Sequence, residues 1–431
     1  MPTLRLLALA FAVAALFLTS PADAQRRRAV RAPAGDLDVF PLAGDDPTIP
    51  SNADLEPLRQ VIGDASVVAL GESYHTSGGF YRLKHRVFRY LVEELGFRAF
   101  AIESDWEPTE RTNTYVQTGE GTAEQAARFS HVVWQSSEYA DLVRWMWEWN
   151  RTHPAPADRL TLFGFDIQQP SQDGPGLAMF LLRLGIPSTD PRSNGLRSCE
   201  GAFGVTHPFG EIPPDRHAAC MQALDAIELH LEANRDDIVR RTSESEFTVA
   251  MLRVKGLRAW EESAFIIAHD FAAGFNPRDE IMAYAFHVQR ARKAPGAKTM
   301  VWAANIHVAQ ALAPRGELPM GSYLEETLGE DFVSFALTAF DAEIDFPGYT
   351  CGSQARSPGS VEGRLAGYGH EALLARPRAG VPNDDILPMG LDLLRPWRVY
   401  DGVLFLMHSP RMHPLAWAPC GTGGVGALSG R

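Results

Sequence analysis

A strand–helix–strand pattern at residues 66–106 constrains the fold more than any other part of the chain. Val67 to Leu70 is a short apolar run that ends at Gly71, as expected for a strand buried on both faces. An amphipathic stripe follows from Phe80 to Leu95, and a second apolar run covers Phe97 to Ile102. This order predicts two parallel strands that are neighbours in one sheet and are joined by a right-handed crossover helix.

Further apolar runs extend the predicted sheet, at residues 160–165, 299–303, 332–337 and 402–407. A helical pattern dominates residues 216–293, with a break at Gly274–Pro277, and residues 341–396 are rich in glycine and proline. We expect this last stretch to be an irregular loop at the rim of a site. The predicted fold class is α/β, with a mostly parallel central sheet flanked by helices and a helical insertion or cap.

The N-terminal segment has the pattern of an export signal. Residues 6–18 are apolar but too few to span a bilayer, and small residues precede a cleavage position after Ala24. We expect a signal peptide at residues 1–24, a flexible lead-in at 25–36 and one domain at 37–431. The processed protein would be periplasmic or secreted, with no stable membrane anchor.

Four cysteines point to disulfide bonds: Cys199, Cys220, Cys351 and Cys420. An even number in an exported protein suggests pairing, and three connectivities are possible. We favour Cys199 with Cys220, which closes a short loop, and Cys351 with Cys420. No C-x-x-C spacing occurs, so a zinc–cysteine site is not expected.

The charge balance bears on partners. The chain has a formal net charge of −13 and a pI of about 5.5. A nucleic-acid-binding protein needs a basic footprint, so no nucleic-acid partner is expected. The partner we expect is a small molecule, and the sequence leaves the oligomeric state open.

Acidic and imidazole side chains follow several of the apolar runs. Glu72, Glu103 and Asp166 each end a different run, His75 follows the first by three residues, and His307 follows the run at 299–303. The carboxyl ends of parallel strands form the ligand-binding edge of an open α/β sheet. Because charged groups there are costly to bury unless they are paired or used, we expect them to form one functional site.

This set of residues favours hydrolysis by an activated water. His75 would take the proton from a water that attacks a carbonyl, and Glu72 or Glu103 would orient its ring. Lys84 or Arg278 would supply the cation where the oxyanion develops. This chemistry requires no cofactor.

Two other chemistries stay open. Residues 71–75 begin like the G-x-S-x-G nucleophile elbow, with Ser73 as the nucleophile, but His75 stands where the elbow needs a small residue. The strand-end acids and histidines are also types that bind a divalent metal, although H-E-x-x-H and related spacings are missing.

Several motifs, taken together, resemble the erythromycin esterase family. They are Gly71-Glu72-x-x-His75, Ala101–Trp106, Phe163–Asp166, Arg278-Asp279-x-x-Met282, Val301–His307, Met320–Leu324, Ser357–Glu362 and Tyr400–Gly402. The resemblance extends over nearly all of the processed chain. It implies an α/β core with helical additions, and hydrolysis of an ester or lactone by an activated water without a covalent intermediate.

The resemblance also implies roles for individual residues. The histidine that matches His75 is the general base, and residues matching Glu72, Glu103 and His307 share its pocket. Basic residues stand at the places of Lys84 and Arg278. We therefore predict catalytic roles for His75, Glu72, Glu103, Arg278 and His307, and substrate binding by Lys84, Asp166 and Asn305.

This chain departs from the family pattern at two positions. Gly79 stands where the family commonly has a glutamate, and Ala304 replaces the first histidine of a His-Asn-x-His motif. The expected substrate is therefore an ester or lactone that need not be a macrolide. These departures also motivate an alternative, a periplasmic binding or scaffold protein that keeps the fold without turnover.

Overall fold

The structure is a computed structural model, and it describes residues 36–417 apart from 204–211, 268, 314–315, 347–349, 379–386 and 391. The expected signal peptide at 1–24 and the lead-in up to residue 35 lie outside the described residues, as does Cys420. Within the described part of the chain, no helix is long and apolar enough to cross a membrane.

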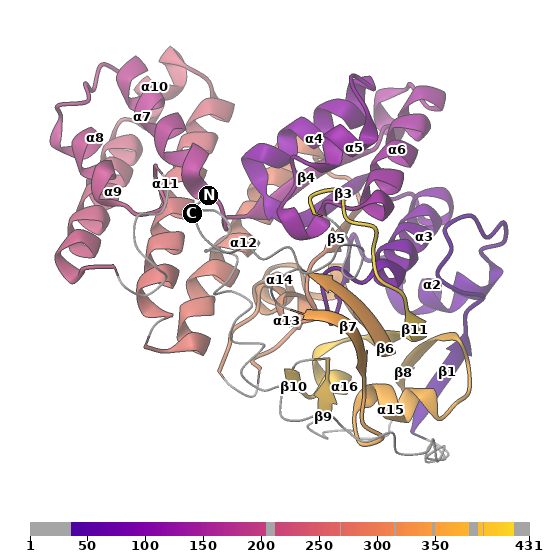
Figure 1. Ribbon diagram of the computed structural model, residues 1–431. Coiled ribbons are helices and arrows are strands. Elements are labelled where there is room, and N and C mark those ends of the chain that lie inside the picture. The colour runs from indigo at the N-terminus through magenta and orange to yellow at the C-terminus, as the bar shows by residue number, and fades with distance from the viewer. Residues whose placement is uncertain are drawn as a thin grey trace.

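A nine-stranded sheet forms the centre of the described structure (Figure 1). The strand order is β1-β8-β11-β6-β2-β5-β3-β4, and β7 pairs with β6. The run from β11 to β4 is parallel throughout, whereas β1, β7 and β8 make antiparallel pairs. The strands are β1 Leu37–Pro41, β2 Val67–Leu70, β3 Ala99–Asp105, β4 Thr161–Asp166, β5 Thr299–Trp302, β6 Phe332–Phe346, β7 Thr350–Ala355, β8 Ala372–Pro377 and β11 Gly402–Ser409.

The two strands of the opening motif are parallel, but they are not neighbours as predicted. β5 lies between them, and its Trp302 is in register with Leu70 of β2 and with Ile102 of β3. Local sequence predicts the strand–helix–strand unit but carries no signal for a strand inserted from 200 residues downstream. The insertion matters because it places the residues after β5 between the ends of β2 and β3.

Helices cover both faces of the sheet, because the sheet residues alternate between two cores. Val68 and Leu70 enter one core, and Val67 and Ala69 enter the other. Residues of α2, α3 and α6 close the first core, and residues of α12, α14 and α15 close the second. These helices are α2 Glu56–Ile62, α3 Gly78–Leu95, α6 Ser137–Thr152, α12 Phe271–Lys293, α14 Met320–Leu328 and α15 Val361–Ala366.

A helical block stands beside the sheet and has its own core (Figure 1). It consists of α7 Asp173–Arg183, α8 Pro191–Gly195, α9 Pro214–Ala233, α10 Arg235–Arg241 and α11 Glu244–Ile266. The Cys199–Cys220 disulfide is present, as predicted, and both cysteines belong to this core. The other predicted disulfide, Cys351 with Cys420, cannot be compared with the structure because Cys420 lies outside the described residues. Two further helices, α4 Trp106–Thr118 and α5 Ala123–Ala127, connect β3 to α6.

The predicted helix break at Gly274–Pro277 was wrong. The helix α12 begins after Asp270, whose side chain accepts a hydrogen bond from Ala273 N, and it continues through Pro277. Gly274 serves close packing: a Cβ there would lie 2.7 Å from the Cα of Ile267. The continuous helix carries Arg278 toward the carboxyl edge of the sheet.

The stretch 341–396, predicted to be an irregular loop, contains regular structure. β6 extends to Phe346 and pairs with β7, and β8 pairs with β1, a strand that was not predicted. The remaining elements are the hairpin of β9 Leu387–Met389 and β10 Asp392–Leu394, and the helix α16 Pro396–Val399. The glycine and proline content of this stretch is typical of loops, and it hid strands whose pairing depends on context; for β8, that context includes β1, which is remote in sequence.

Candidate active site

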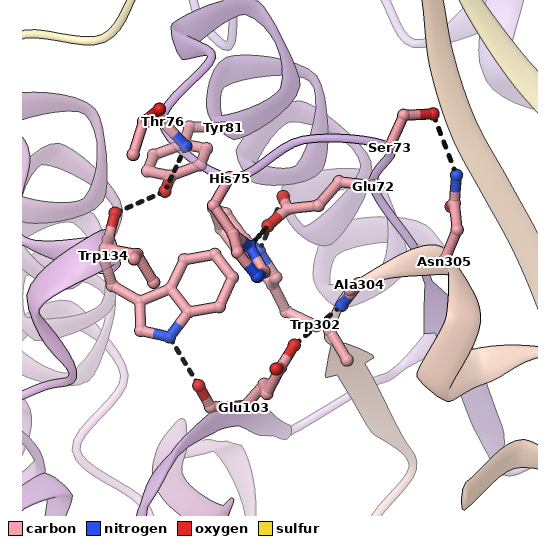
Figure 2. A network of polar contacts seen from close by, with 12 residues as sticks. Glu72, Ser73, His75, Thr76, Tyr81, Glu103, Trp134, Trp302, Ala304 and Asn305 are labelled. Carbon is pink, nitrogen blue, oxygen red and sulfur yellow. Dashed lines mark hydrogen bonds and ion pairs between the residues drawn. The ribbon is translucent and has the colours of Figure 1, made fainter. Parts of the chain in front are cut away.

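His75 lies on the turn between β2 and α3 and is held by Glu72 (Figure 2). The distance from His75 Nδ1 to Glu72 Oε1 is 2.7 Å. The other carboxylate oxygen, Oε2, accepts hydrogen bonds from Lys84 Nζ at 2.9 Å and from Trp302 Nε1 at 3.1 Å. Glu72 is therefore a fixed acceptor whose geometry sets the orientation of the His75 ring.

The backbone after His75 is strained. Thr76 has φ 66°, a left-handed conformation that non-glycine residues rarely adopt, and it is the one such residue in the described part of the chain. Its N–H donates to Tyr81 Oη at 3.3 Å, and Tyr81 Oη donates to Val133 O at 2.7 Å. Strain that surrounding contacts maintain is typical of functional turns, and here it positions the imidazole.

Lys84 is wholly buried beneath the turn. Its Nζ contacts Glu72, the Ala303 carbonyl at 3.3 Å and the Trp302 ring at 4.6 Å from the centroid. Burial lowers the pKa of Lys84 to about 8, against the opposing attraction of Glu72. Lys84 thus supports Glu72 from inside the protein. Neither side chain is exposed, and Glu72 in turn contacts His75, which is partly exposed.

Trp134 forms a wall of the site that the sequence reading missed. Its ring meets His75 edge to face, with centroids 4.8 Å apart, and its indole N–H donates to the Glu103 carbonyl (Figure 2). Trp134 lies on a separate turn, Val132–Trp134, and no spacing in the sequence connects it to His75.

Glu103, Asp166 and Arg278 form a second, buried charge cluster. The Arg278 guanidinium donates to both Asp166 oxygens, from Nε at 3.0 Å and Nη2 at 2.8 Å, and to Glu103 Oε1 at 2.8 Å. Glu103 Oε2 accepts from Ala304 N at 2.8 Å. Burial alone would raise the pKa of Asp166, but Arg278 outweighs it and holds that pKa well below its usual range. Both carboxylates therefore stay ionised.

His307 completes this cluster. Its Nδ1 lies 2.7 Å from Asp279 Oδ1, and its Nε2 lies 3.1 Å from Arg278 Nη1 and 3.4 Å from Glu103 Oε1. Burial and Arg278 lower the pKa of His307, but Asp279 and Glu103 outweigh them and raise it. Asp279, which also accepts from Met320 N at 2.8 Å, was not among the predicted site residues although it adjoins Arg278.

Asn305 is buried and its amide is fully used. Its Nδ2 donates to Ser73 Oγ and to Leu337 O, both at 3.1 Å, and its Oδ1 accepts from Leu337 N at 3.0 Å. A Cβ at Gly71 would lie 2.1 Å from that Oδ1, so the turn requires glycine there. Asn305 thus ties the His75 turn to β6.

Ser73, the alternative nucleophile, points to the side of Glu72 away from His75 (Figure 2). Its hydroxyl donates to Thr338 Oγ1 at 2.7 Å and accepts from Asn305. These contacts belong to the support of the turn. A serine nucleophile needs a base within hydrogen-bond reach, and the imidazole of His75 is turned to Glu72 instead.

The predicted residues therefore meet at one edge of the sheet, in two connected networks. Glu72, His75 and Lys84 form one, and Glu103, Asp166, Arg278 and His307 form the other, with Trp134 touching both. The side chains of His75 and Arg278 are 15% and 13% exposed. The carboxylates that bind them, of Glu72, Glu103 and Asp166, are nearly inaccessible to solvent. Across the described residues, no three His, Cys, Asp or Glu side chains are arranged to hold a metal ion.

A histidine held by a carboxylate, near an arginine that two further carboxylates bind, lies at the carboxyl edge of the parallel strands, where α/β proteins bind their ligands. The chain belongs to the erythromycin esterase family, since the family model described as Erythromycin esterase matches residues 92–395. The matched stretch includes Glu103, Asp166, Arg278 and His307.

Two relatives from Escherichia coli cover most of the chain. The erythromycin esterase type II is 24% identical over 351 residues, which are 73% of this chain and 81% of that protein. The erythromycin esterase type I is 25% identical over 312 residues, 68% of this chain and 75% of that protein.

Solved structures confirm the predicted fold class. A Bacillus cereus protein matches with a TM-score of 0.73 at 18% identity, covering 87% of this chain and 96% of its own. A mutant of the erythromycin esterase EreC, in its open conformation, matches with a TM-score of 0.69 at 19% identity, covering 87% of this chain and 98% of its own.

Proposed function

We propose that this protein is an exported hydrolase that cleaves a carboxylic ester or lactone with a water molecule activated by His75. The observation that carries the proposal is the contact of His75 with Glu72. Because both oxygens of Glu72 are acceptors, the neutral His75 ring carries its hydrogen on Nδ1. The lone pair is then on Nε2, which makes Nε2 the basic atom.

In the proposed reaction, Nε2 takes a proton from water while the water oxygen attacks the carbonyl carbon. The imidazolium forms beside the Glu72 carboxylate, which stabilises its charge. The tetrahedral intermediate then expels the alkoxide as the acyl C–O bond breaks, and Nε2 returns the proton to that oxygen. An ester gives an acid and an alcohol, and a lactone gives a hydroxy acid.

Arg278 is the group we propose for the developing oxyanion. It is the cation of the second network, its side chain is 13% exposed, and two buried carboxylates fix its orientation. A cation held in place before reaction stabilises new negative charge without reorganisation, typically accelerating the reaction by about 10²–10³. The proposed binding roles of Asp166 and Asn305 are indirect, through Arg278 and the His75 turn.

Export is proposed from the apolar N-terminal run and from the disulfide in the helical block. The substrate class comes from the family and from the printed names of the two relatives, which are esterases of erythromycin. For this chain we propose an ester or lactone, of which a macrolide is one case.

The test is hydrolysis by the purified protein of p-nitrophenyl butyrate, δ-valerolactone and erythromycin, with and without His75→Ala. We expect turnover that falls by about 10²–10⁴ in the variant. His153→Ala is the matched control, because that histidine is the C-cap of α6 and stacks on Trp149 with centroids 3.9 Å apart, and it belongs to neither network. Equal rates for wild type and His75→Ala would remove His75 from the mechanism.

The same assay separates the alternatives. Activity that survives exhaustive chelation excludes a metal-dependent hydrolase, and activity lost on chelation and restored by a divalent metal supports one. Saturable binding of erythromycin without turnover would support the binding or scaffold protein, since that class keeps the site but not the reaction.

A further inference from the structure

A third histidine, His131, lies close to the two networks, with its backbone N–H bound to Ser104, the residue after Glu103. His131 precedes the turn that carries Trp134 and is 6% exposed. Its Nδ1 is buried and has no hydrogen-bond partner among the described residues. Buried polar atoms nearly always have partners, so an unpaired ring nitrogen beside a charged cluster requires an explanation.

The position of His131 is fixed by the end of β3. His131 N donates to Ser104 Oγ at 2.9 Å, and the indole of Trp134 donates to the carbonyl of the preceding residue, Glu103. Trp134 N also donates to His131 O at 2.9 Å. Two anchors on consecutive strand residues therefore place the Trp134 ring against His75 and hold His131 in the same short turn.

The electrostatic surroundings show which charges lie near the ring. The charges of Asp166, His75, Glu103 and Arg278 all act on His131, so His131 lies within electrostatic reach of both networks, in the same short turn as the Trp134 that contacts His75. Burial is the main effect, and it lowers the pKa of His131 to about 4. At neutral pH the ring is uncharged, with one nitrogen that donates and one that accepts.

His85 is an internal comparison. It is likewise buried, at 5% exposure, its Nε2 likewise has no partner among the described residues, and burial lowers its pKa to about 3. However, Arg89 is the one charge that acts on it, and its ring packs on Trp145 in the helical layer. An unpaired nitrogen alone is therefore not diagnostic, and what distinguishes His131 is its position against the site.

We propose that His131 binds the substrate, its ring hydrogen-bonding an oxygen of the ester or lactone beside the carbonyl that His75-activated water attacks. The inference rests on the proposed function and deepens it. An uncharged imidazole held by a rigid turn can donate a hydrogen bond to the substrate oxygen. Because it carries no charge, it does not compete with Arg278 for the carboxylates of the second network. In the substrate-free protein its nitrogen has no partner, and the substrate oxygen supplies one.

The test compares His131→Phe, His131→Asn and His85→Phe on whichever of p-nitrophenyl butyrate, δ-valerolactone and erythromycin the wild type hydrolyses fastest. We expect His131→Phe to lower kcat/KM about tenfold or more, as for one lost hydrogen bond, without lowering Tm. His131→Asn, which keeps a donor, should recover part of the loss. His85→Phe should leave kcat/KM unchanged.

Several outcomes would overturn the inference. One is a folded His131→Phe variant with wild-type kcat/KM, and another is an equal loss in His131→Phe and His85→Phe, which would indicate a general packing effect. If His131→Phe does not fold, His131→Ala is assayed with added imidazole: rescue supports substrate binding, and no rescue rejects it.

A wild type that hydrolyses none of the three compounds would refute the proposed function without deciding the role of His131. Binding of benzylphosphonate, a tetrahedral anion, then decides it by calorimetry. Wild-type binding that weakens about tenfold in His131→Phe supports the inference. Equal binding, or no binding by the wild type, overturns it.

Discussion

Lys84 and Glu72 form an ion pair in which neither side chain is exposed to solvent, with 2.9 Å between Nζ and Oε2. Glu72 contacts both His75 and Lys84, so the proposed base is oriented by a carboxylate whose charge Lys84 neutralises. An unpaired carboxylate at this depth would favour its protonated form, which accepts a hydrogen bond from His75 less well. The pair therefore links the stability of the fold to the proposed activity.

Replacing Lys84 by Met should damage both properties. It leaves Glu72 buried without its cation, at an expected cost of about 3–5 kcal/mol in the free energy of unfolding, measured with urea. We expect kcat/KM to fall in the same variant. The double change Lys84→Met with Glu72→Leu should restore most of the stability but none of the activity. Restored activity would show that the pair is purely structural.

Asp105 should make stability depend on pH. Burial and the nearby Asp166 raise its pKa to about 7. The folded state keeps this proton up to about pH 7, whereas the unfolded chain loses it near pH 4, so the stability it contributes is lost as pH rises between those values. Asp105→Asn should therefore gain about 2–3 kcal/mol relative to wild type between pH 5 and pH 8.

Denaturant unfolding at the two pH values checks this prediction. Asp237→Asn is the control, because its side chain is 51% exposed on α10 and should give the same difference at both. A difference for Asp105→Asn that does not change with pH would show that the carboxyl titrates normally in the folded protein.

Gly79 should not tolerate a side chain. A Cβ there would lie 2.6 Å from Ser409 Oγ and 3.0 Å from Ser409 Cα, where α3 crosses β11. Because the backbone at Ser409 or Gly79 would have to shift, we expect Gly79→Ala to lower the free energy of unfolding by about 1–3 kcal/mol, measured by thermal or urea unfolding. Gly359→Ala, where a Cβ meets nothing within 4 Å, should be near neutral. Equal stabilities for the two variants would contradict this account of the family departure at Gly79.

The Cys199–Cys220 disulfide should stabilise the helical block. It closes a loop with a sequence separation of 21, for which chain entropy predicts about 3 kcal/mol. Cys199→Ala with Cys220→Ala should unfold at lower denaturant concentration, and in dithiothreitol wild type and the double variant should unfold at the same midpoint. A further loss when the double variant is reduced would reveal a contribution from the predicted Cys351–Cys420 pair.

Much of the local structure was predictable because its causes are local. The strand Val67–Leu70 and the helix up to Leu95 follow from apolar spacing and the C-cap at Gly96, and both have these limits in the structure. The acids at strand ends were recognisable because a parallel sheet brings such ends to one edge. Their catalytic roles stay predictions.

The partners of those residues were not predictable. Asp279 and Trp134 contact His307 and His75, respectively, yet no spacing in the sequence connects either pair. Arg278 was predicted to follow a helix break, but it lies inside α12, which begins after Asp270 and runs through Pro277.

The sequence by itself determined the class of sheet, the approximate positions of its inner strands and which side chains stand near their carboxyl ends, since each depends on periodicity over a few residues. Tertiary structure alone decided that β5 enters between β2 and β3, bringing His307 to Glu103 and Trp302 to Glu72. The reason is physical: strand pairing joins segments 200 residues apart through backbone hydrogen bonds that any sequence makes, and only the packing of the whole chain selects the pair.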